Sequence, residues 1–155
     1  KANKPYLGSC LGAQMMARQL GARVYRHPEQ RVEIGYYPIK ATEQGEKLCD
    51  ATFPCHVYQW HSEGFELAPG AVLLAEGEHF PVQAMRYGPN AYGIQFHPDV
   101  TYAMICRWSV RADHRLCEPG AQPAHVQRAF WHQYDRAFDV WSHKFIDRWL
   151  SQTIA

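Results

Sequence analysis

Short apolar runs separated by turn residues dominate the chain as far as residue 96. Runs of about four to eight branched, aromatic or other apolar residues, bounded by glycine, proline or polar clusters, predict β-strands. Such runs occupy residues 5–9, 22–25, 32–39, 57–60, 72–75, 82–87 and 91–96. Gly88-Pro89-Asn90 separates the last two runs, and this composition predicts a hairpin turn between them.

Two other segments carry the three-to-four-residue periodicity of an amphipathic helix. Apolar residues form one stripe from residue 11 to residue 20, and Gly21 follows where a left-handed cap would end that helix. The last part of the chain repeats apolar side chains at Val126, Phe130, Tyr134, Phe138, Trp141, Phe145 and Trp149. We expect one long helix there, packing its aromatic face on a sheet and preceded by a break at residues 118–120.

The order of strands and helices predicts an α/β fold. We expect a flavodoxin-like, doubly wound and mostly parallel sheet with flanking helices, a β-hairpin in the C-terminal half and the long C-terminal helix. A chain of 155 residues with 46% hydrophobic content can bury one substantial core, and no repeat or low-complexity tract interrupts it. Residues 1–155 are therefore expected to form a single domain.

Charge and cysteine usage narrow the class of partner. Sixteen basic and fifteen acidic residues give a formal net charge of +1, which offers no large field for nucleic acid or an anionic membrane. No apolar run is long enough to span a bilayer, and the first residues lack a signal-peptide pattern. The five cysteines lack CxxC spacing and the nine histidines are scattered, so we expect no metal and no cofactor. These features predict a cytoplasmic protein that binds a small molecule or another protein.

A glycine-flanked cysteine lies between the first predicted strand and the first predicted helix. Gly8-Ser9-Cys10-Leu11-Gly12 has the strand-turn-helix context of a nucleophile elbow, with cysteine in place of serine. We expect Gly8 and Gly12 to leave room for close backbone approach. A thiol at a helix start also meets the positive end of the helix dipole, which favours the thiolate. The alternative is a small buried cysteine on a glycine-rich turn.

A histidine and a carboxylate follow the last predicted strand. His97, Pro98 and Asp99 come directly after its apolar end. A thiolate nucleophile needs a base, and the base needs a third group that fixes its tautomer, so His97 and Asp99 are the predicted partners of Cys10. His27-Pro28-Glu29 offers a second histidine and carboxylate, but its polar surroundings predict an exposed loop.

The two motifs together resemble the class I glutamine amidotransferase family. The resemblance is carried by residues 6–14, which include Gly8-Ser9-Cys10-Leu11-Gly12, and by Gly93-Ile94-Gln95-Phe96-His97-Pro98. Trp60-His61-Ser62 and residues 83–88 are similar to the branch that resembles the amidotransferase domain of GMP synthase, often found as a stand-alone protein. The resemblance covers nearly the whole chain.

The resemblance implies hydrolysis of the glutamine side-chain amide through a γ-glutamyl thioester on Cys10. The products would be glutamate and ammonia, and an ammonia-accepting synthetase, where there is one, would be a separate chain. The backbone N–H of Leu11 would form half of the oxyanion hole. The family's triad normally ends in glutamate, whereas this chain has Asp99, which keeps the charge but is shorter by one methylene.

The resemblance also names residues that would contact the substrate. By position these are Gly8, Gln14, His61 and Ser62. In the family, strands before the elbow carry a glycine-rich loop that supplies the second oxyanion donor, and no segment of this chain matches that loop. The domain is therefore expected to be truncated at its N-terminus.

Three alternatives stay open at this point. A γ-glutamyl peptide or γ-glutamyl amine hydrolase would use the same thioester and differ only in the leaving group. A non-catalytic binding or regulatory module on the same fold would agree with Asp99 and with the unmatched oxyanion loop. A redox sensor would use Cys10 as a reactive thiol.

Overall fold

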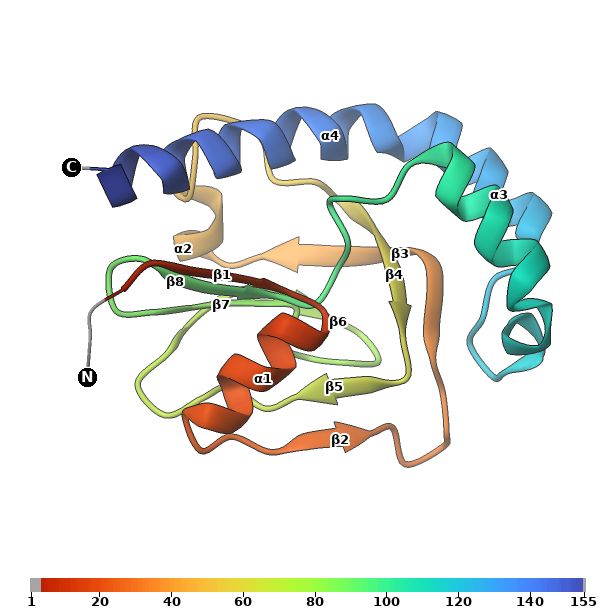
Figure 1. The fold of residues 1–155 in the computed structure, drawn as a ribbon, viewed down its shortest axis with the longest axis horizontal. Coiled ribbons are helices and arrows are strands. Elements are labelled where there is room, and N and C mark those ends of the chain that lie inside the picture. Colours follow the sequence, from red (N-terminus) through yellow and green to blue (C-terminus); the bar gives the residue numbers. More distant parts are fainter. Residues whose placement is uncertain (1–3, 155) are drawn as a thin grey trace.

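The computed structural model describes residues 4–154. Its elements follow one another in the order β1 (Tyr6–Ser9), α1 (Leu11–Gln19), β2 (Val24–Arg26), β3 (Glu33–Ala41), α2 (Glu43–Glu46), β4 (His56–His61), β5 (Glu63–Phe65), β6 (Val72–Gly77), β7 (Ala84–Tyr87), β8 (Ala91–Ile94), α3 (Tyr102–Arg111), the 3-10 helix η1 (Asp113–Cys117) and α4 (Ala124–Ile154). The long helix α4 runs across one side of the molecule, and α1 lies on the other side (Figure 1).

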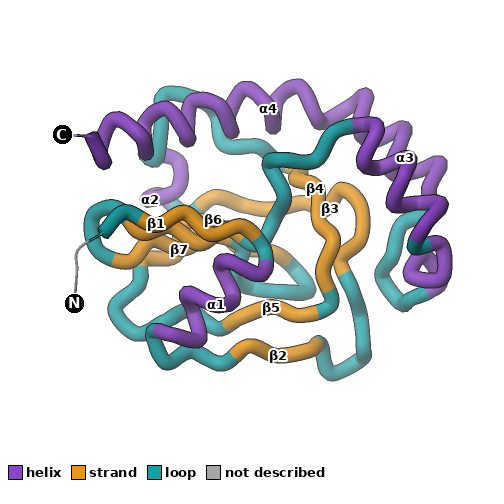
Figure 2. The backbone as a smooth tube through the Cα atoms, in the orientation of Figure 1, coloured by secondary structure: helices purple, strands orange, loops and turns teal. Residues whose placement is uncertain are grey.

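The strands form two sheets. Six strands pair in the order β1-β8-β7-β6-β3-β4, and β2 pairs with β5 in a separate small sheet. Figure 2 shows the small sheet beside α1, on the side of the molecule away from α4. The predicted α/β class, the hairpin of β7 and β8, and the long C-terminal helix are all confirmed.

The expectation that the sheet is mostly parallel is wrong. Within residues 4–154, β1 and β8 are the one parallel pair, and the other pairings are antiparallel. For β7 and β8 the short turn at residues 88–90 explains the antiparallel pairing, because a turn of a few residues can join only antiparallel neighbours. The parallel partners β1 and β8 are adjacent in space, but the strands β2 to β7 lie between them in the sequence.

The aromatic stripe of α4 supplies one core. Phe138, Trp141 and Phe145 are at most 3% exposed and pack with Phe96 and Ile94 between α4 and the sheet. Burying a side chain of this size contributes about 1.5–3 kcal/mol. A second cluster, which includes Ala13, Ala17, Phe65 and Met85, fills the space between α1 and the opposite side of the sheet.

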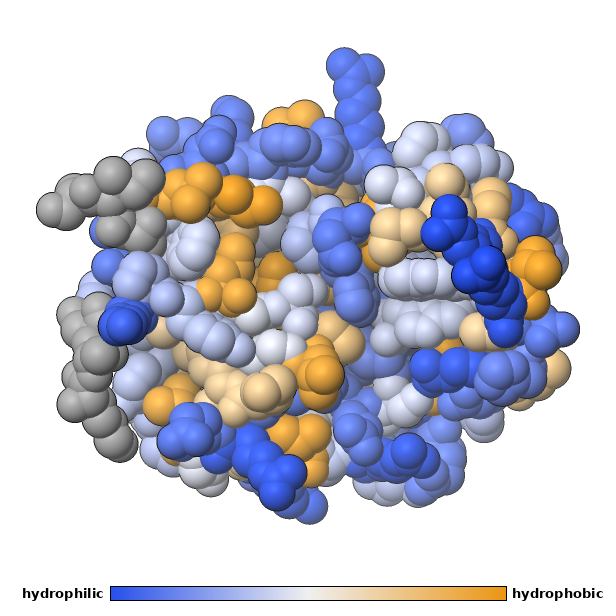
Figure 3. All heavy atoms as spheres, in the orientation of Figure 1, coloured by the Kyte–Doolittle hydropathy of each residue, from blue (hydrophilic) through white to orange (hydrophobic). Residues whose placement is uncertain are grey.

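Several elements differ from the sequence-based expectation. The sequence pattern predicts neither the strand β5 nor the helix α3. Glu63–Phe65 is only three residues long, and of residues 102–111 only Ile105 and Ser109 are buried. Thr101 caps α3, since its hydroxyl accepts a hydrogen bond from the Met104 N–H at 3.3 Å. Within residues 4–154, no helix combines the length and the apolar character that crossing a membrane requires. On the face shown in Figure 3, apolar groups are small and separated by hydrophilic side chains.

The helix α1 packs tightly over the strand that precedes it. A Cβ added at Gly8 would lie 2.6 Å from the Gly12 carbonyl carbon and 2.8 Å from the Ala13 nitrogen. Because both neighbours are backbone atoms, an added methyl group could be accommodated only by moving the helix. A Cβ at Gly12 would meet nothing closer than the Tyr6 hydroxyl at 3.6 Å, so the expectation that Gly12 also leaves room for backbone is wrong.

We predict that Gly8→Ala lowers the free energy of unfolding by about 1–3 kcal/mol, the usual cost of overpacking. Gly12→Ala is the matched control, and it should leave stability unchanged or raise it slightly, because alanine favours helix more than glycine does. Urea denaturation followed by circular dichroism measures both. Equal unfolding midpoints for Gly8→Ala and the parent chain would contradict the packing described here.

Candidate active site

Cys10 occupies the sharp turn between β1 and α1. Its backbone has φ 47° and ψ −106°, a conformation that side-chain-bearing residues rarely adopt. Such a residue costs about 1–3 kcal/mol and persists only where its surroundings hold it. Here the Cys10 N–H donates to the Ile94 carbonyl at 2.8 Å, and the Ser9 hydroxyl donates to the Phe96 carbonyl at 2.9 Å. The elbow is therefore fixed by the end of β8.

The same strand end carries His97. In the parallel register Ser9 lies opposite Ile94, so the residues after both strands emerge at one edge of the sheet. The His97 N–H donates to the Tyr58 carbonyl of β4 at 2.9 Å, which holds the histidine beside the elbow. Its ring packs edge-on against Trp108, with the centroids 6.1 Å apart. Segments far apart in sequence thus meet at Cys10.

The electrostatics of His97 reflect both of its neighbours. Burial by itself lowers the pKa of His97, but hydrogen bonds to Asp99 and Cys10 and the negative charges of both groups raise it to about 9. The His97 Nδ1 to Asp99 Oδ1 distance is 3.3 Å. The hydrogen bond with His97 in turn lowers the pKa of Asp99. The arrangement favours a positively charged His97 at neutral pH.

A small pocket opens beside the sulfur. It has a volume of about 260 Å³ and is lined by Cys10, Gln14, Arg26, Trp60, His61, Ser62, Glu63 and Arg115. These side chains come from α1, both sheets and η1. Three of the four residues expected at the substrate, Gln14, His61 and Ser62, line this pocket. Gly8 lies beneath the elbow, packed against α1.

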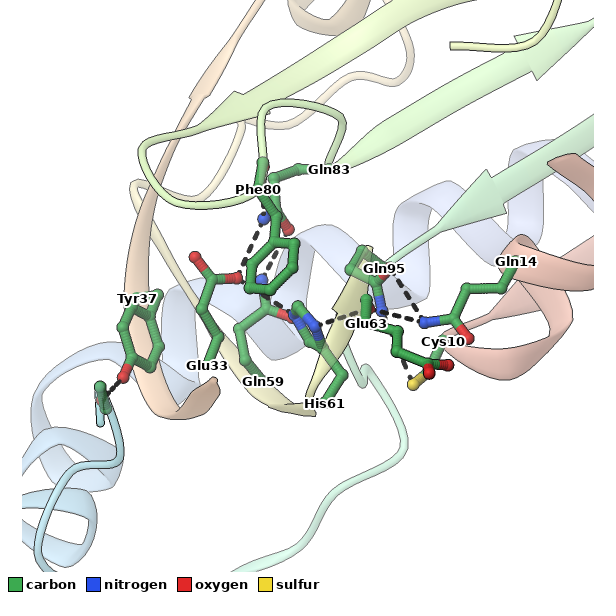
Figure 4. Close-up of polar contacts among 11 residues, drawn as sticks. Cys10, Gln14, Glu33, Tyr37, Gln59, His61, Glu63, Phe80, Gln83 and Gln95 are labelled. Carbon is green, nitrogen blue, oxygen red and sulfur yellow. Dashed lines mark hydrogen bonds and ion pairs between the residues drawn. The ribbon is translucent and has the colours of Figure 1, made fainter. Parts of the chain in front are cut away.

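Gln14 and His61 are held by one backbone carbonyl. The Gln14 Nε2 donates to the Glu63 carbonyl at 2.8 Å, and the His61 Nδ1 lies 3.0 Å from the same oxygen (Figure 4). The other His61 nitrogen lies 3.1 Å from a carboxylate oxygen of Glu33. Both ring nitrogens therefore have partners inside the protein, and the 4%-exposed His61 supports the pocket wall.

A buried polar network backs this wall. Gln83 Nε2 donates to the Glu33 carboxylate at 3.1 Å, and Gln59 Nε2 donates to Gln83 Oε1 at 2.6 Å (Figure 4). Glu33, Gln59 and Gln83 are at most 2% exposed. Buried polar groups are tolerated when they are hydrogen-bonded to one another, and such a network fixes the geometry of what rests on it.

Sequence reasoning gave no role to several residues around the sulfur. Gln95 lies in the recognised motif, and its Nε2 donates to Cys10 Sγ at 3.7 Å. Glu33 could have been noticed as a carboxylate inside an apolar strand. Glu63 directly follows the recognised His61-Ser62 pair, whereas Arg115 carries no local signal, because only the folded chain brings it to the pocket beside Cys10.

The histidine-proline-glutamate triplet at residues 27–29 lies away from Cys10 and His97. His27 Nδ1 accepts a hydrogen bond from the Glu29 N–H at 3.2 Å, and its ring packs edge-on against His79 and Phe80. In the described part of the chain, no group of three or more His, Cys, Asp or Glu side chains could hold a metal ion. The five cysteines are free thiols.

The first residue of α1 offers a hydrogen-bond donor beside Cys10. Leu11 begins the helix, and the first N–H groups of a helix have no intrahelical acceptor. The Cys10 N–H is engaged by Ile94, so the N–H of Leu11 is the next donor along the chain. In a nucleophile elbow, one oxyanion donor is the N–H of the residue after the nucleophile, and Leu11 holds that position in the sequence.

Known proteins share this sequence pattern and this fold. The family model described as glutamine amidotransferase class-I matches residues 1–104. The chain is 39% identical over 107 residues to the glutamine amidotransferase-like protein YfeJ of Salmonella typhimurium, covering 67% of this chain and 44% of that protein. It is 34% identical over 117 residues to a subunit of the glutamine-hydrolyzing GMP synthase of Pyrococcus abyssi, covering 74% and 61%.

Solved structures agree with the sequence relatives. A glutamine amidotransferase from Thermotoga maritima superposes with a TM-score of 0.79 at 28% identity, over 94% of this chain and 62% of that one. A glutamine amidotransferase from Methylobacillus flagellatus has the same fold, with a TM-score of 0.85 at 23% identity, over 96% and 63%. The chain spans less than two thirds of the length of each of these four proteins. With the family model matching residues 1–104, the chain belongs to the class I glutamine amidotransferase family.

Proposed function

We propose that this protein hydrolyses the side-chain amide of glutamine through a γ-glutamyl thioester on Cys10. The observation that carries the proposal is the cluster at the edge of the β1–β8 pair. There a cysteine in a left-handed elbow lies beside a histidine whose pKa is raised to about 9 and whose ring contacts Asp99. Family membership supports the same chemistry.

In the proposed first step, the Cys10 thiolate attacks the amide carbon of glutamine. A carbon–sulfur bond forms, and the amide oxygen takes the negative charge of a tetrahedral intermediate. The Leu11 N–H stabilises that oxyanion as one half of the oxyanion hole. The His97 imidazolium gives its proton to the amide nitrogen, the carbon–nitrogen bond breaks and ammonia leaves.

In the second step, water attacks the thioester carbon. Neutral His97 takes a proton from that water, the carbon–sulfur bond breaks, and glutamate leaves with the Cys10 thiolate regenerated. Asp99 keeps the imidazole oriented in both steps and offsets its positive charge. The pair at 3.3 Å retains this interaction although aspartate replaces the family's glutamate.

We also propose that a separate synthetase chain accepts the ammonia. The Pyrococcus abyssi relative is named as a subunit of GMP synthase, a name that describes one part of a larger enzyme. Association with a second chain would keep ammonia from escaping into solvent.

Replacement of the nucleophile gives the direct test. Cys10→Ala in the full-length protein should abolish release of ammonia and glutamate from glutamine, because no thioester can form. Cys106→Ala is the matched control, since Cys106 is also partly buried but lies on α3 outside the pocket. A coupled glutamate assay measures both. Glutamine hydrolysis that survives in Cys10→Ala would overturn the mechanism.

A second prediction concerns the protonation of His97. Its pKa of about 9 should fall in Asp99→Asn, because the hydrogen bond to the carboxylate and its charge are lost while the effect of burial stays. The rate of ammonia release should decline as the pH rises through the pKa of His97, so the decline in Asp99→Asn should begin at lower pH. NMR titration of the imidazole and a pH–rate profile measure the two effects.

Asp139→Asn is the control for this experiment. The exposed His143–Asp139 pair on α4 has the same 3.3 Å separation as His97–Asp99, and the pKa of His143 is raised first by a hydrogen bond to the Asp139 backbone carbonyl and then by the Asp139 charge. The control removes only the charge, so it should lower the pKa of His143 slightly and leave His97 unchanged. An unchanged pKa of His97 in Asp99→Asn would show that the carboxylate does not act on the imidazole.

A further inference from the structure

Another hollow lies at the end of the β1–β8 pair that is far from Cys10. Cys10 directly follows β1, whereas Asn90, which lines the hollow, directly precedes the parallel strand β8. The hollow has a volume of about 540 Å³, and its lining comes from α2, β6, the β7–β8 hairpin and α4. The C-terminal end of α4, the helix α2 and the hairpin turn lie at one end of the molecule (Figure 1). The hollow shares no lining residue with the pocket beside Cys10.

Three cationic side chains line this hollow, which we name the basic pocket after Lys47, Arg86 and Arg148. None of the described residues that line it is acidic. Glu43 lies 2.5 Å from the Lys47 ammonium group and offsets much of its charge, but neither arginine forms an ion pair within residues 4–154. The whole chain carries a net charge of only +1, so the positive charge of the basic pocket is a local feature. Such a pocket favours an anionic ligand.

Tyr92 adds a hydroxyl group to the basic pocket. Tyr92 is 4% exposed, and its ring packs edge-on against Phe145 with the centroids 5.4 Å apart. Burial raises the pKa of Tyr92, and the charges of Arg86 and Arg148 act in the opposite direction, so both guanidinium groups lie near the hydroxyl. Within the described part of the chain, that hydroxyl has no hydrogen-bond partner. A polar group buried in this way needs a partner, and a ligand in the pocket would supply one.

Asn90 holds the hairpin that carries Arg86 against the helix that carries Arg148. The Asn90 carbonyl accepts a hydrogen bond from the Trp149 Nε1 at 3.1 Å, and the Asn90 Nδ2 donates to the Gln152 carbonyl at 3.4 Å. The two arginines therefore belong to segments that are joined beside the pocket. A site whose walls are already fixed costs a ligand little ordering free energy.

The amide oxygen of Gln152 also lacks a partner. Gln152 Oε1 is buried, and no described residue donates a hydrogen bond to it. Gln152 lines the basic pocket together with the amide side chains of Gln44 and Asn90. The unpaired oxygen calls for a donor, and amide groups can both donate to and accept from the hydroxyl groups of a ligand. The volume of about 540 Å³ leaves room for more than an inorganic anion.

We propose that the basic pocket binds a small phosphate monoester with a hydroxyl-bearing body. Arg86, Arg148 and the Tyr92 hydroxyl bind the phosphate group, and Gln44 and Gln152 contact the hydroxyl groups. A phosphate monoester carries a charge of about −1.5 to −2 at pH 7 and offers three acceptor oxygens, which suit two guanidinium groups and a hydroxyl better than a carboxylate does. The inference does not depend on the proposed function, because none of these residues lines the pocket beside Cys10.

Three anions test the class of ligand. Isothermal titration calorimetry of the full-length protein measures its affinity for glucose 6-phosphate, for glucuronate and for inorganic phosphate. Glucuronate carries a carboxylate in place of the phosphate group, and inorganic phosphate lacks the sugar. Glucose 6-phosphate should bind roughly tenfold more tightly than either, the effect of one or two additional hydrogen bonds. Equal affinity for glucuronate would overturn the phosphate group as the recognised feature, and equal affinity for inorganic phosphate would overturn the hydroxyl-bearing body.

Substitutions test the residues that bind the phosphate group. Arg86→Gln and Arg148→Gln should each weaken the binding of glucose 6-phosphate by roughly tenfold to a hundredfold, because each removes a charged donor. Tyr92→Phe should weaken it by about tenfold, while the ring keeps its contact with Phe145. Because the Tyr92 hydroxyl has no partner within residues 4–154, the urea unfolding midpoint of Tyr92→Phe should equal that of the parent chain.

Arg136→Gln is the matched control. Arg136 is also an exposed arginine on α4, but it does not line the basic pocket. Because Arg136→Gln and Arg148→Gln change the net charge equally, an effect of net charge alone would appear in both. The affinity for glucose 6-phosphate should be unchanged in Arg136→Gln. An equal fall in the two variants, an unchanged affinity in Arg148→Gln, or no binding of glucose 6-phosphate to the parent protein would overturn the proposal.

Discussion

Parallel pairing of β1 with β8 is the constraint on which the site depends. The register that places Ser9 opposite Ile94 lets the Cys10 N–H reach the Ile94 carbonyl, and it brings the residues after both strands to one edge. A shift of one residue would turn each side chain of β1 to the other face of the sheet. The elbow conformation, the position of His97 and the packing of α1 over Gly8 all presuppose this single register.

The strand β4 and the small sheet hold the other wall of the site. The Tyr58 carbonyl holds the backbone of His97, and the carbonyl of Glu63, the first residue of β5, contacts Gln14 and His61. Glu33, which belongs to the buried polar network, contacts the other ring nitrogen of His61. Because Gln14, His61, Glu33 and Gln83 are hydrogen-bonded within the protein, moving one of them would leave others without partners, which favours a rigid pocket wall.

The sequence predicted those features that depend on residues close together in the chain. The elbow around Cys10, the hairpin at residues 88–90 and the aromatic stripe of α4 each depend on residues within one segment, so their patterns could be read directly. The antiparallel strand order and the placement of Arg115 beside Ser62 depend on segments far apart in the chain. No local periodicity reports such pairings, and the analogy with doubly wound folds suggested more parallel strands than are present.

Opposing effects on the pKa of His97 bear on the replacement of the family's glutamate by Asp99. Burial opposes the imidazolium, and Asp99 and Cys10 together more than compensate. Asp99 is 64% exposed, so water screens its charge, and its effect depends on the direct contact at 3.3 Å. The hydrogen bond and the electrostatic interaction between Cys10 and His97 make up the rest of the compensation. The shorter carboxylate therefore still touches the ring of His97 and favours its positive charge.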